Sequence, residues 1–261
     1  MSKSNRNQTS SHRLICLVPS LSETLYALDL EDAVVGITRY CVHPPNWLEI
    51  KTIIGGTKDP KLEKMIALKP TLVIANDEEN RKEDVVALRE AGCRVYVSHI
   101  ETFSDLMTCI NDLSELLQRT ALAKKLITHL TMHYDRLKDA LLTTPNRPPK
   151  VLYLIWRRPY MAVAQNTWID HILTHLGCLN ACSHLSRYPV VELTQLAELK
   201  VDYVFLSSEP YSFKEKHIDE ITQVYPEITS LLVDGEVFSW YGPRLFHLEQ
   251  EVQRIAPYFK S

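Results

Sequence analysis

The sequence has only seven glycines in 261 residues. Gly55-Gly56 is too short to form the glycine-rich loop that cradles a phosphate group. A G-x-S-x-G motif and a paired Cys–His signature are also absent from the sequence. These absences favour a binding protein over an enzyme, and we predict no catalytic residue.

An excess of positive charge and long apolar runs are missing as well. The net charge is -3, so we expect no nucleic-acid partner. No apolar run reaches the length needed to span a membrane. The polar N-terminus, MSKSNRNQTSSHR, has no apolar stretch of the kind found in a secretory signal. We therefore expect a cytoplasmic protein, or one whose export signal is missing from this sequence.

The six cysteines show no regular spacing. Several lie in apolar strand or helix patterns, which favours buried, reduced thiols over a disulfide framework. Cys178 and Cys182 with His184 have the composition of a metal cluster, but no second matching pair exists, so we predict no zinc site. The full set is Cys16, Cys41, Cys93, Cys109, Cys178 and Cys182.

Two histidine pairs have the i,i+4 spacing that can bind a metal on one helix face. They are His129 with His133 and His171 with His175. Neither pair carries the glutamate of the H-E-x-x-H motif, so we expect both pairs on solvated faces. His43, before two prolines, is a better ligand candidate, and we interpret it as a hydrogen-bonding pocket residue. We predict no direct metal ligand and no cofactor.

The stretch GGTKDPKLEKMIALKPTLVIAND, residues 55–77, indicates a helix followed closely by a strand. Asp59 is suited to an N-cap and Pro60 to the first helical position. Pro70 ends the helix, and TLVIA is an apolar run typical of a buried strand. The stretch therefore forms half of an α/β unit.

Strands alternate with helices over the first hundred residues, which predicts a mostly parallel sheet covered on both faces. From Ser104 to Thr143 no strand pattern occurs, and a leucine stripe after Thr120 indicates a long helix. The α/β alternation then resumes. We expect four parts: a disordered tail (1–12), an N-terminal α/β lobe (13–118), a bridging helix (119–145) and a C-terminal α/β lobe (146–261).

A similarity between two segments of the sequence supports two similar lobes. LEKMIALKPTLVIA in the first half resembles LTQLAELKVDYVFL in the second. Both copies run from a strand into acidic residues. Ligands of open α/β sheets bind at the carboxyl ends of the strands, so two facing sheets predict a cleft for a ligand.

The sequence resembles the substrate-binding proteins of ABC importers for vitamin B12 and iron-siderophore complexes, the helical-backbone metal receptors (class III periplasmic-binding-protein-like). The resemblance covers the chain from about Arg13 to its C-terminus. The segments that carry it are RLICLVPSLSETLYAL, VVGITRYCVHPP, GGTKDPKLEKMIALKPTLVIA, NRKEDVVALREAGCRVYV and DGEVFSWYGPR.

This resemblance implies two α/β lobes with mostly parallel sheets, bridged by one long helix. The implied ligand is a small-molecule metal chelate that contains cobalt or iron, and the implied partner is an ABC permease in the membrane. The implied location is periplasmic or on the cell surface. We expect a monomer.

Aromatic and arginine side chains are the candidates for the cleft. Aromatic faces offer a large contact area to a macrocycle, and arginines bind carboxylate or phosphate groups. The alternative is that the tryptophans belong to the core and the arginines to the solvated surface. The candidates are Arg39, Tyr40, His43, Trp156, Arg157, Arg187, Tyr188, Trp240, Tyr241 and Arg244. For SWYGPR (239–244) we favour the cleft, because polar-tipped large residues beside a Gly-Pro turn make a poor core.

Acidic residues on each lobe are candidates for docking to a permease, where charges at the rim of an interface orient association. Surface charge without a partner is the alternative. The candidates are Glu78, Glu79 and Glu83 on the first lobe and Glu192, Glu198 and Glu209 on the second. The sequence leaves two further functions open: a cytoplasmic carrier of the same fold without a permease, and an enzyme acting on a metal-containing small molecule.

Overall fold

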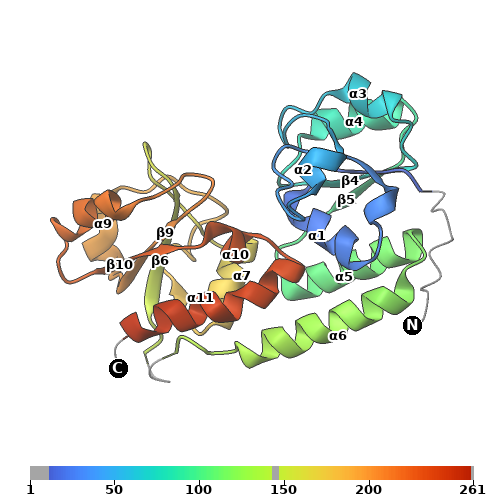
Figure 1. Cartoon of the computed structure of the whole chain (residues 1–261). Coiled ribbons are helices and arrows are strands. Elements are labelled where there is room, and N and C mark those ends of the chain that lie inside the picture. Colours follow the sequence, from blue (N-terminus) through green and yellow to red (C-terminus); the bar gives the residue numbers. More distant parts are fainter. Residues whose placement is uncertain (1–11, 143–146, 260–261) are drawn as a thin grey trace. The chain divides into compact units, whose positions relative to one another are not determined.

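The chain folds into two α/β units, each built on a five-stranded sheet (Figure 1). The computed structural model describes residues 12–142 and 147–259. Unit 1 consists of the described residues up to His99 together with Met107–Leu126, and unit 2 of Ile100–Leu106 with the described residues from Ile127 onward. Of the predicted tail 1–12, residues 1–11 lie outside the described residues.

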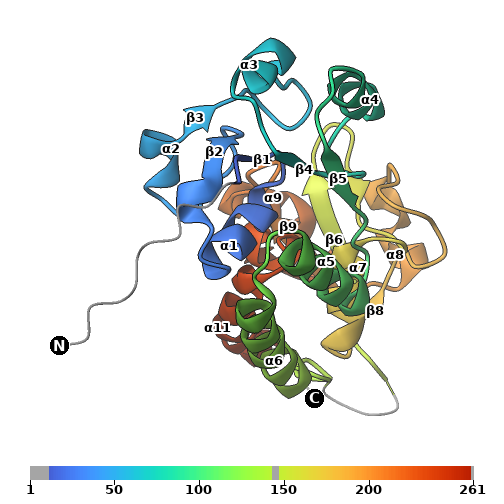
Figure 2. The same cartoon turned by 90° about the vertical axis from the view of Figure 1, so that its right-hand side faces the viewer.

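The sheet of unit 1 is entirely parallel, with strand order β3-β2-β1-β4-β5. Figure 2 shows β1 between β2 and β4. β1 and β4 are buried along their whole length, as expected for strands with helices on both faces. The strands are β1 (Leu14–Cys16), β2 (Val34–Ile37), β3 (Thr52–Ile53), β4 (Leu72–Asn76) and β5 (Val95–Ser98).

Short helices connect these strands. Apolar residues from β1, β4, α3 and α4 form one core cluster that includes Ile15, Met65 and Val73. The elements are α1 (Pro19–Ala27), η1 (Glu31–Ala33), α2 (Trp47–Ile50), α3 (Leu62–Ala67) and α4 (Lys82–Glu90).

The predicted start of the helix at Pro60 is wrong. Helix α3 begins at Leu62, and residues 59–61 belong to a turn, because Pro60 bridges to Gly55 and the Lys61 amide donates to the Ile54 carbonyl at 2.7 Å. Gly55 has a φ of 110°, a conformation that favours glycine.

Helix α6 (Thr120–Arg136) lies in the region 119–145 predicted as the bridging helix, and α5 (Phe103–Leu116) precedes it within the predicted N-terminal lobe. The break between the two helices lies at Gln118, which adopts a left-handed φ of 57°. Helix α6 ends at Arg136 and turns follow it, while residues 143–145 of the predicted helix lie outside the described part. Each helix contains residues of both units. That this region bridges two lobes stays a prediction.

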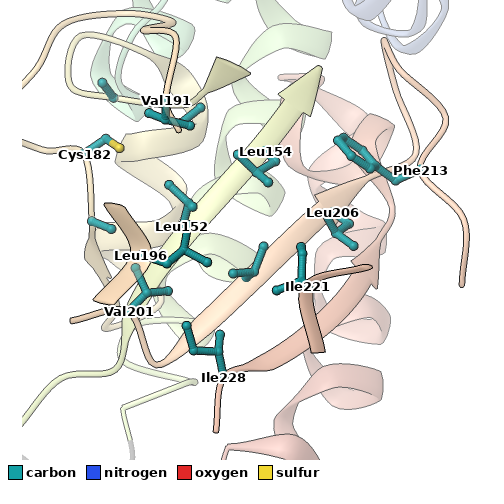
Figure 3. Packing of buried hydrophobic residues seen from close by; sticks show 14 residues of the cluster. Leu152, Leu154, Cys182, Val191, Leu196, Val201, Leu206, Phe213, Ile221 and Ile228 are labelled. Atoms are coloured by element: carbon teal, nitrogen blue, oxygen red, sulfur yellow. The ribbon is translucent and has the colours of Figure 1, made fainter. Parts of the chain in front are cut away.

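The sheet of unit 2 has strand order β10-β9-β6-β7, with β8 paired to β6. All pairs are parallel except β6 with β7. Apolar side chains from β6 and β9 form the core shown in Figure 3, and Tyr160 and Tyr211 pack against it. The strands are β6 (Lys150–Trp156), β7 (Met161–Ala162), β8 (Leu179–Asn180), β9 (Tyr203–Ser207) and β10 (Thr229–Val233).

The helical elements of unit 2 include two that the sequence patterns did not indicate clearly, α9 and the short α10. They are α7 (Trp168–His175), η2 (Leu193–Gln195), α8 (Leu196–Leu199), α9 (Glu215–Thr222), α10 (Gly235–Ser239), η3 (Pro243–His247), α11 (Leu248–Ile255) and η4 (Ala256–Tyr258). None of the helices described in either unit is long and apolar enough to cross a membrane.

The two similar segments, LEKMIALKPTLVIA and LTQLAELKVDYVFL, form corresponding elements in the two units. The first copy forms α3 and β4, and the second forms η2, α8 and β9. The aligned Lys69 and Lys200 both adopt left-handed φ values, 47° and 50°, between helix and strand. Strands β4 and β9 are both fully buried.

Candidate functional site

In unit 1 an exposed aromatic ring follows the carboxyl end of β2. Tyr40 is 50% exposed, and the Arg39 guanidinium lies 5.8 Å from the centre of its ring. Arg39 is held in place because its amide donates to the Gly55 carbonyl at 2.9 Å and its side chain pairs with Asp59 at 2.7 Å. This edge of the sheet therefore presents a flat aromatic face beside a cation.

His43 lies in the same loop and is half-buried. Its backbone is fixed to α1, because the Ser22 hydroxyl donates to the His43 carbonyl at 2.6 Å. Arg39, Tyr40 and His43 thus lie in one loop of unit 1, and a ligand-binding role for them stays a prediction.

In unit 2 an exposed aromatic residue also stands at the carboxyl end of a central strand. Trp156 ends β6 and is 40% exposed. Its ring meets the ring of Tyr211 edge-on, with centroids 5.8 Å apart. The Tyr211 hydroxyl lies 3.3 Å from Nε2 of the buried His217, whose Nδ1 accepts from the Lys214 amide at 2.8 Å. A chain of contacts therefore holds the Trp156 ring.

Arg157 is engaged within its own unit. Its guanidinium donates to both carboxylate oxygens of Glu220, at 2.8 and 2.9 Å, and to the Tyr160 hydroxyl at 3.3 Å. Hydrogen bonds to Tyr160 and then to Glu220 raise the pKa of Arg157 above its ordinary value. The arrangement fastens the end of β6 to α9, so Arg157 positions Trp156.

The segment 239–244 packs into unit 2, and the expectation that its large side chains make a poor core is wrong. Trp240, Tyr241 and Arg244 are 8%, 5% and 8% exposed. Trp240 Nε1 donates to Glu209 at 2.9 Å, and the Arg244 guanidinium lies 5.6 Å from the Trp240 ring. The Trp240 N–H is thus satisfied by a carboxylate of the same unit, which favours burial of its ring. A ligand-binding role for them stays a prediction.

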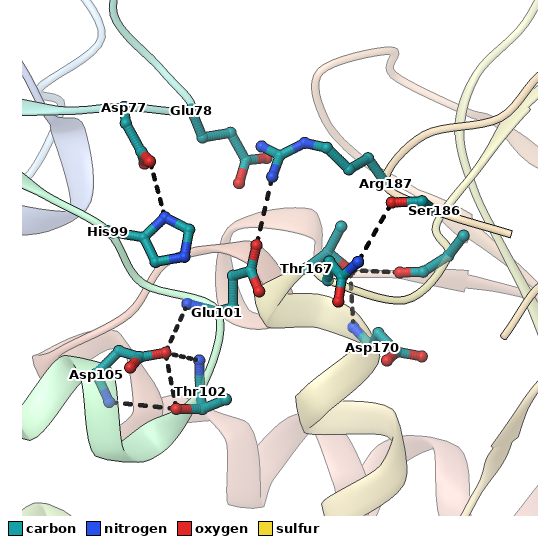
Figure 4. Close-up of polar contacts among 12 residues, drawn as sticks. Asp77, Glu78, His99, Glu101, Thr102, Asp105, Thr167, Asp170, Ser186 and Arg187 are labelled. Atoms are coloured by element: carbon teal, nitrogen blue, oxygen red, sulfur yellow. Dashed lines mark hydrogen bonds and ion pairs between the residues drawn. The ribbon is translucent and has the colours of Figure 1, made fainter.

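Arg187 and Tyr188 lie in the segment that follows the short strand β8. Arg187 Nη1 lies 3.4 Å from the Glu101 carboxylate, as Figure 4 shows. Arg187 has a left-handed φ of 60°, and both residues are half-buried. Glu101 is a neighbour that the sequence patterns did not indicate.

The acidic residues after β4 are held by a buried amide network. The Asn76 side-chain oxygen accepts from the amides of Glu78 and Glu79 at 2.9 and 3.2 Å. The Asn80 side chain accepts from the Asn76 amide at 2.8 Å. Asp77, which precedes them, pairs with His99 at 2.7 Å (Figure 4). This network fixes the shape of the acidic turn, while Glu83 is exposed on α4.

On unit 2, Glu192 and Glu198 are exposed, but Glu209 is not the rim charge that the sequence suggested. The Glu209 carboxylate accepts from the Ser239 hydroxyl at 2.8 Å and from Trp240. Burial raises the pKa of Glu209. Glu209 therefore supports the Trp240 segment, and we no longer assign it to docking.

The histidine pairs differ from the expectation of solvated faces. His171 and His175 are half-buried, and the His175 ring stacks on Tyr134 with centroids 3.5 Å apart. His129 is exposed, whereas His133 contacts the ring of Phe246. Within residues 12–142 and 147–259, no group of three or more His, Cys, Asp or Glu side chains is arranged to hold a metal ion.

Sequence reasoning missed the residues that position Trp156, namely Tyr211, His217 and Glu220. The aromatic run YSF (211–213), four residues after the last residue of β9, was the available signal, since it follows the carboxyl end of a buried strand. Glu220 gave no comparable signal, because a lone acid on a short helix looks like any solvated residue.

The chain is similar to known binding proteins in sequence and in structure. A curated relative, the vitamin B12-binding protein of Vibrio cholerae serotype O1, is 25% identical over 198 residues, which cover 76% of this chain and 71% of the relative. The crystal structure of the periplasmic vitamin B12 binding protein of Vibrio cholerae matches with a TM-score of 0.79 at 22% identity, over 96% of this chain and 97% of that chain.

A periplasmic heme-binding protein from Roseiflexus sp. RS-1, solved in its apo form, also has a TM-score of 0.79, at 18% identity over 95% of this chain and 98% of that chain. These structural likenesses confirm the predicted fold of two α/β units with mostly parallel sheets. The family model described as periplasmic binding protein matches residues 14–228, and the chain belongs to this family.

Proposed function

We propose that this protein binds a metal chelate of the corrinoid, heme or siderophore type and delivers it to an ABC importer. One observation carries the proposal: each unit presents an exposed aromatic ring with an adjacent arginine at the carboxyl end of a strand. In unit 1 these are Tyr40 and Arg39, and in unit 2 they are Trp156 and Arg157.

Flat aromatic faces suit a flat macrocycle, because offset stacking removes a large apolar area from water on both partners. Proteins similar to this chain are named for vitamin B12 and for heme, and both ligands contain a metal in a tetrapyrrole-derived ring. We infer a ligand of this class, bound noncovalently, with its metal coordinated by the ring and not by a cluster of protein side chains.

Delivery to a permease is the second part of the proposal, and it includes export to the periplasm or the cell surface. Family membership and the exposed acids Glu192 and Glu198 support it. A cytoplasmic carrier of the same fold is the alternative, and an enzyme acting on the chelate is a further one. Localisation of the protein in its host distinguishes the first two, and conversion of the bound probe would favour the third.

The test is titration with cyanocobalamin, hemin and a ferric siderophore, followed by tryptophan fluorescence. We expect binding of at least one probe, and we expect Tyr40→Ala and Trp156→Ala each to weaken it by about 1–3 kcal/mol, as for aromatic anchors at interfaces. Tyr26→Ala and Tyr258→Ala are matched controls, because these tyrosines are 51% and 50% exposed in units 1 and 2.

Equal losses in the test and control variants would contradict the assignment of the two aromatic residues. Failure of all three probes to bind the wild-type protein, with its fold intact by circular dichroism, would contradict the proposed ligand class.

A further inference from the structure

Two buried thiols meet beside the loop that carries Arg39, Tyr40 and His43. Cys16 ends β1, and Cys41 follows the neighbouring strand β2. Neither side chain is exposed to solvent. Cys41 Sγ lies 3.9 Å from the Cys16 carbonyl oxygen, and Cys16 Sγ donates to the Val18 carbonyl at 3.1 Å. The fold therefore brings together two cysteines that are 25 residues apart in the sequence.

The two thiols have different surroundings. Burial raises the pKa of Cys41, but hydrogen bonds from Cys16, Thr38 and Ser22 outweigh burial and lower it overall. Thr38 Oγ1 lies 3.3 Å from Cys41 Sγ. For Cys16, burial and the contact with Cys41 raise the pKa. These hydrogen bonds favour the thiolate of Cys41, and the thiolate is the reactive form.

We propose that Cys16 and Cys41 form an intramolecular disulfide when the protein meets a disulfide donor, and that this bond ties the Arg39–His43 loop to the central strand of unit 1. The bond differs from the reduced state that the sequence predicted for all six cysteines. Its effect on a ligand rests on the function proposed above, whereas its formation does not.

The reaction is thiol–disulfide exchange with a donor RSSR, such as oxidised glutathione or a thiol oxidoreductase. The Cys41 thiolate attacks one donor sulfur, forms a mixed disulfide and releases RS⁻. The Cys16 thiol then loses its proton, attacks the Cys41 sulfur and releases the second RS⁻. The two protons from the cysteines end on the two leaving thiolates, so two thiols and RSSR give one disulfide and two RSH. Because both thiols are buried, the donor reaches Cys41 while residues 38–45 are open or not yet folded.

The bond has a clear consequence for the loop. Closing a covalent link between neighbouring strands restricts the unfolded chain and the open states of the loop. In the oxidised protein, Tyr40 and His43 stay close to their positions in the structure, and the reduced protein keeps the larger range of loop motion.

The test is refolding of the full chain in glutathione buffers of increasing oxidising strength, followed by alkylation of free thiols with iodoacetamide in denaturant and digestion with trypsin without reduction. Cleavage after Arg39 separates Cys16 and Cys41 into the peptides 14–39 and 40–51. We expect these peptides to appear linked and to separate on reduction. Alkylation of Cys41 should fall at least about tenfold, which corresponds to a buffer potential about 30 mV above the reduction potential of the cysteine pair.

Cys16→Ser should abolish the linked peptide and restore alkylation of Cys41. Cys109→Ser is the matched control, because Cys109 is also buried in unit 1 but interacts with Tyr96 instead of a thiol, and it should keep the link. Separate, fully alkylated peptides under the most oxidising condition would overturn the proposal, and so would equal linkage of Cys41 to several other cysteines.

Titrations with hemin, cyanocobalamin and the ferric siderophore are run on both redox forms in a separate experiment. A protein that forms the link but binds none of the three probes contradicts the proposed function and leaves the disulfide established. A protein that binds a probe but never forms the link contradicts the disulfide alone.

Discussion

Glu209 shows how a single carboxylate can be structural at a position where the sequence suggests a surface role. It follows β9 and accepts hydrogen bonds from Ser239 and Trp240. Without Glu209, the indole N–H of a residue that is only 8% exposed would lose this partner. Buried donors without an acceptor are costly, so the carboxylate stabilises the packing of the whole 239–244 segment.

We expect Glu209→Ala to lower the free energy of unfolding by about 1–3 kcal/mol, because it leaves buried donors unsatisfied. Glu209→Gln keeps an acceptor oxygen and should cost less. Urea denaturation measures both, with Glu198→Ala as the control, since an exposed acid should change stability by no more than about 0.5 kcal/mol. A loss in Glu198→Ala as large as that in Glu209→Ala would contradict this role.

At the scale of secondary-structure elements, two histidines of α7 contact Tyr134 of α6. The Tyr134 ring of α6 stacks on the His175 ring. The Tyr134 hydroxyl oxygen lies 2.8 Å from Nε2 of His171. The same His171 nitrogen accepts from the Phe103 amide at 3.1 Å. Burial is the main cause that lowers the pKa of both histidines. Nearby carboxylates have the opposite, smaller effect: Asp105 and Asp170 raise the pKa of His171, and Asp135 and Asp139 raise that of His175.

This packing predicts a dependence of stability on pH. Because the folded protein binds fewer protons at these two sites than the unfolded chain, stability should fall as the pH drops below the ordinary histidine value of 6.5. Unfolding followed by circular dichroism between pH 8 and pH 5 measures the effect. His175→Phe keeps an aromatic ring for stacking and should reduce the slope. His129→Phe, at an exposed position of α6, is the control and should leave the slope of stability against pH unchanged. An identical slope in the wild type and both variants would argue against the prediction.

Helices and strands were predictable from the sequence where local patterns determine them, and not where tertiary contacts do. The β4 and β9 strands were predictable, because uninterrupted apolar runs indicate strands buried on both faces. The left-handed φ of Gln118, beside the predicted boundary at 118/119, was not predictable, because no glycine marks that position. The α3 start was missed for a different reason: Asp59 has the chemistry of an N-cap but pairs with Arg39 instead.

The candidate site was partly predictable in the same sense. Aromatic residues at strand ends could be identified from position alone, as for Tyr40 and Trp156. Burial of Trp240 could not, because it depends on Glu209, a partner 31 residues away in the sequence.

At the scale of the whole molecule, four acids of the two units are the candidates for contact with a permease. Glu78 and Glu79 are held in a fixed turn by Asn76, and Glu192 and Glu198 are exposed on unit 2. We expect the charge reversals Glu78→Lys with Glu79→Lys, and Glu192→Lys with Glu198→Lys, to weaken permease binding and to leave ligand affinity unchanged. Interactions of this kind are screened by salt, since the Debye length falls from about 10 Å at 0.1 M to about 3 Å at 1 M.

Binding to the host permease is measured at both salt concentrations for each variant. Glu90→Lys with Glu115→Lys controls for the change in net charge, because both of these acids are exposed elsewhere in unit 1. Docking would be ruled out for these residues if the control pair weakened binding as much as the test pairs.

The division of α5 and α6 between the units has a consequence for synthesis on the ribosome. Cys109, Ile110 and Leu113 of α5 are buried in unit 1, yet Ile100–Leu106, which emerges before them, belongs to unit 2. Domains generally fold as units during synthesis, starting from the N-terminus. Unit 1 therefore has all its parts only once Leu126 has left the exit tunnel, and a nascent chain that stops at His99 still lacks the residues 107–126 that complete the unit.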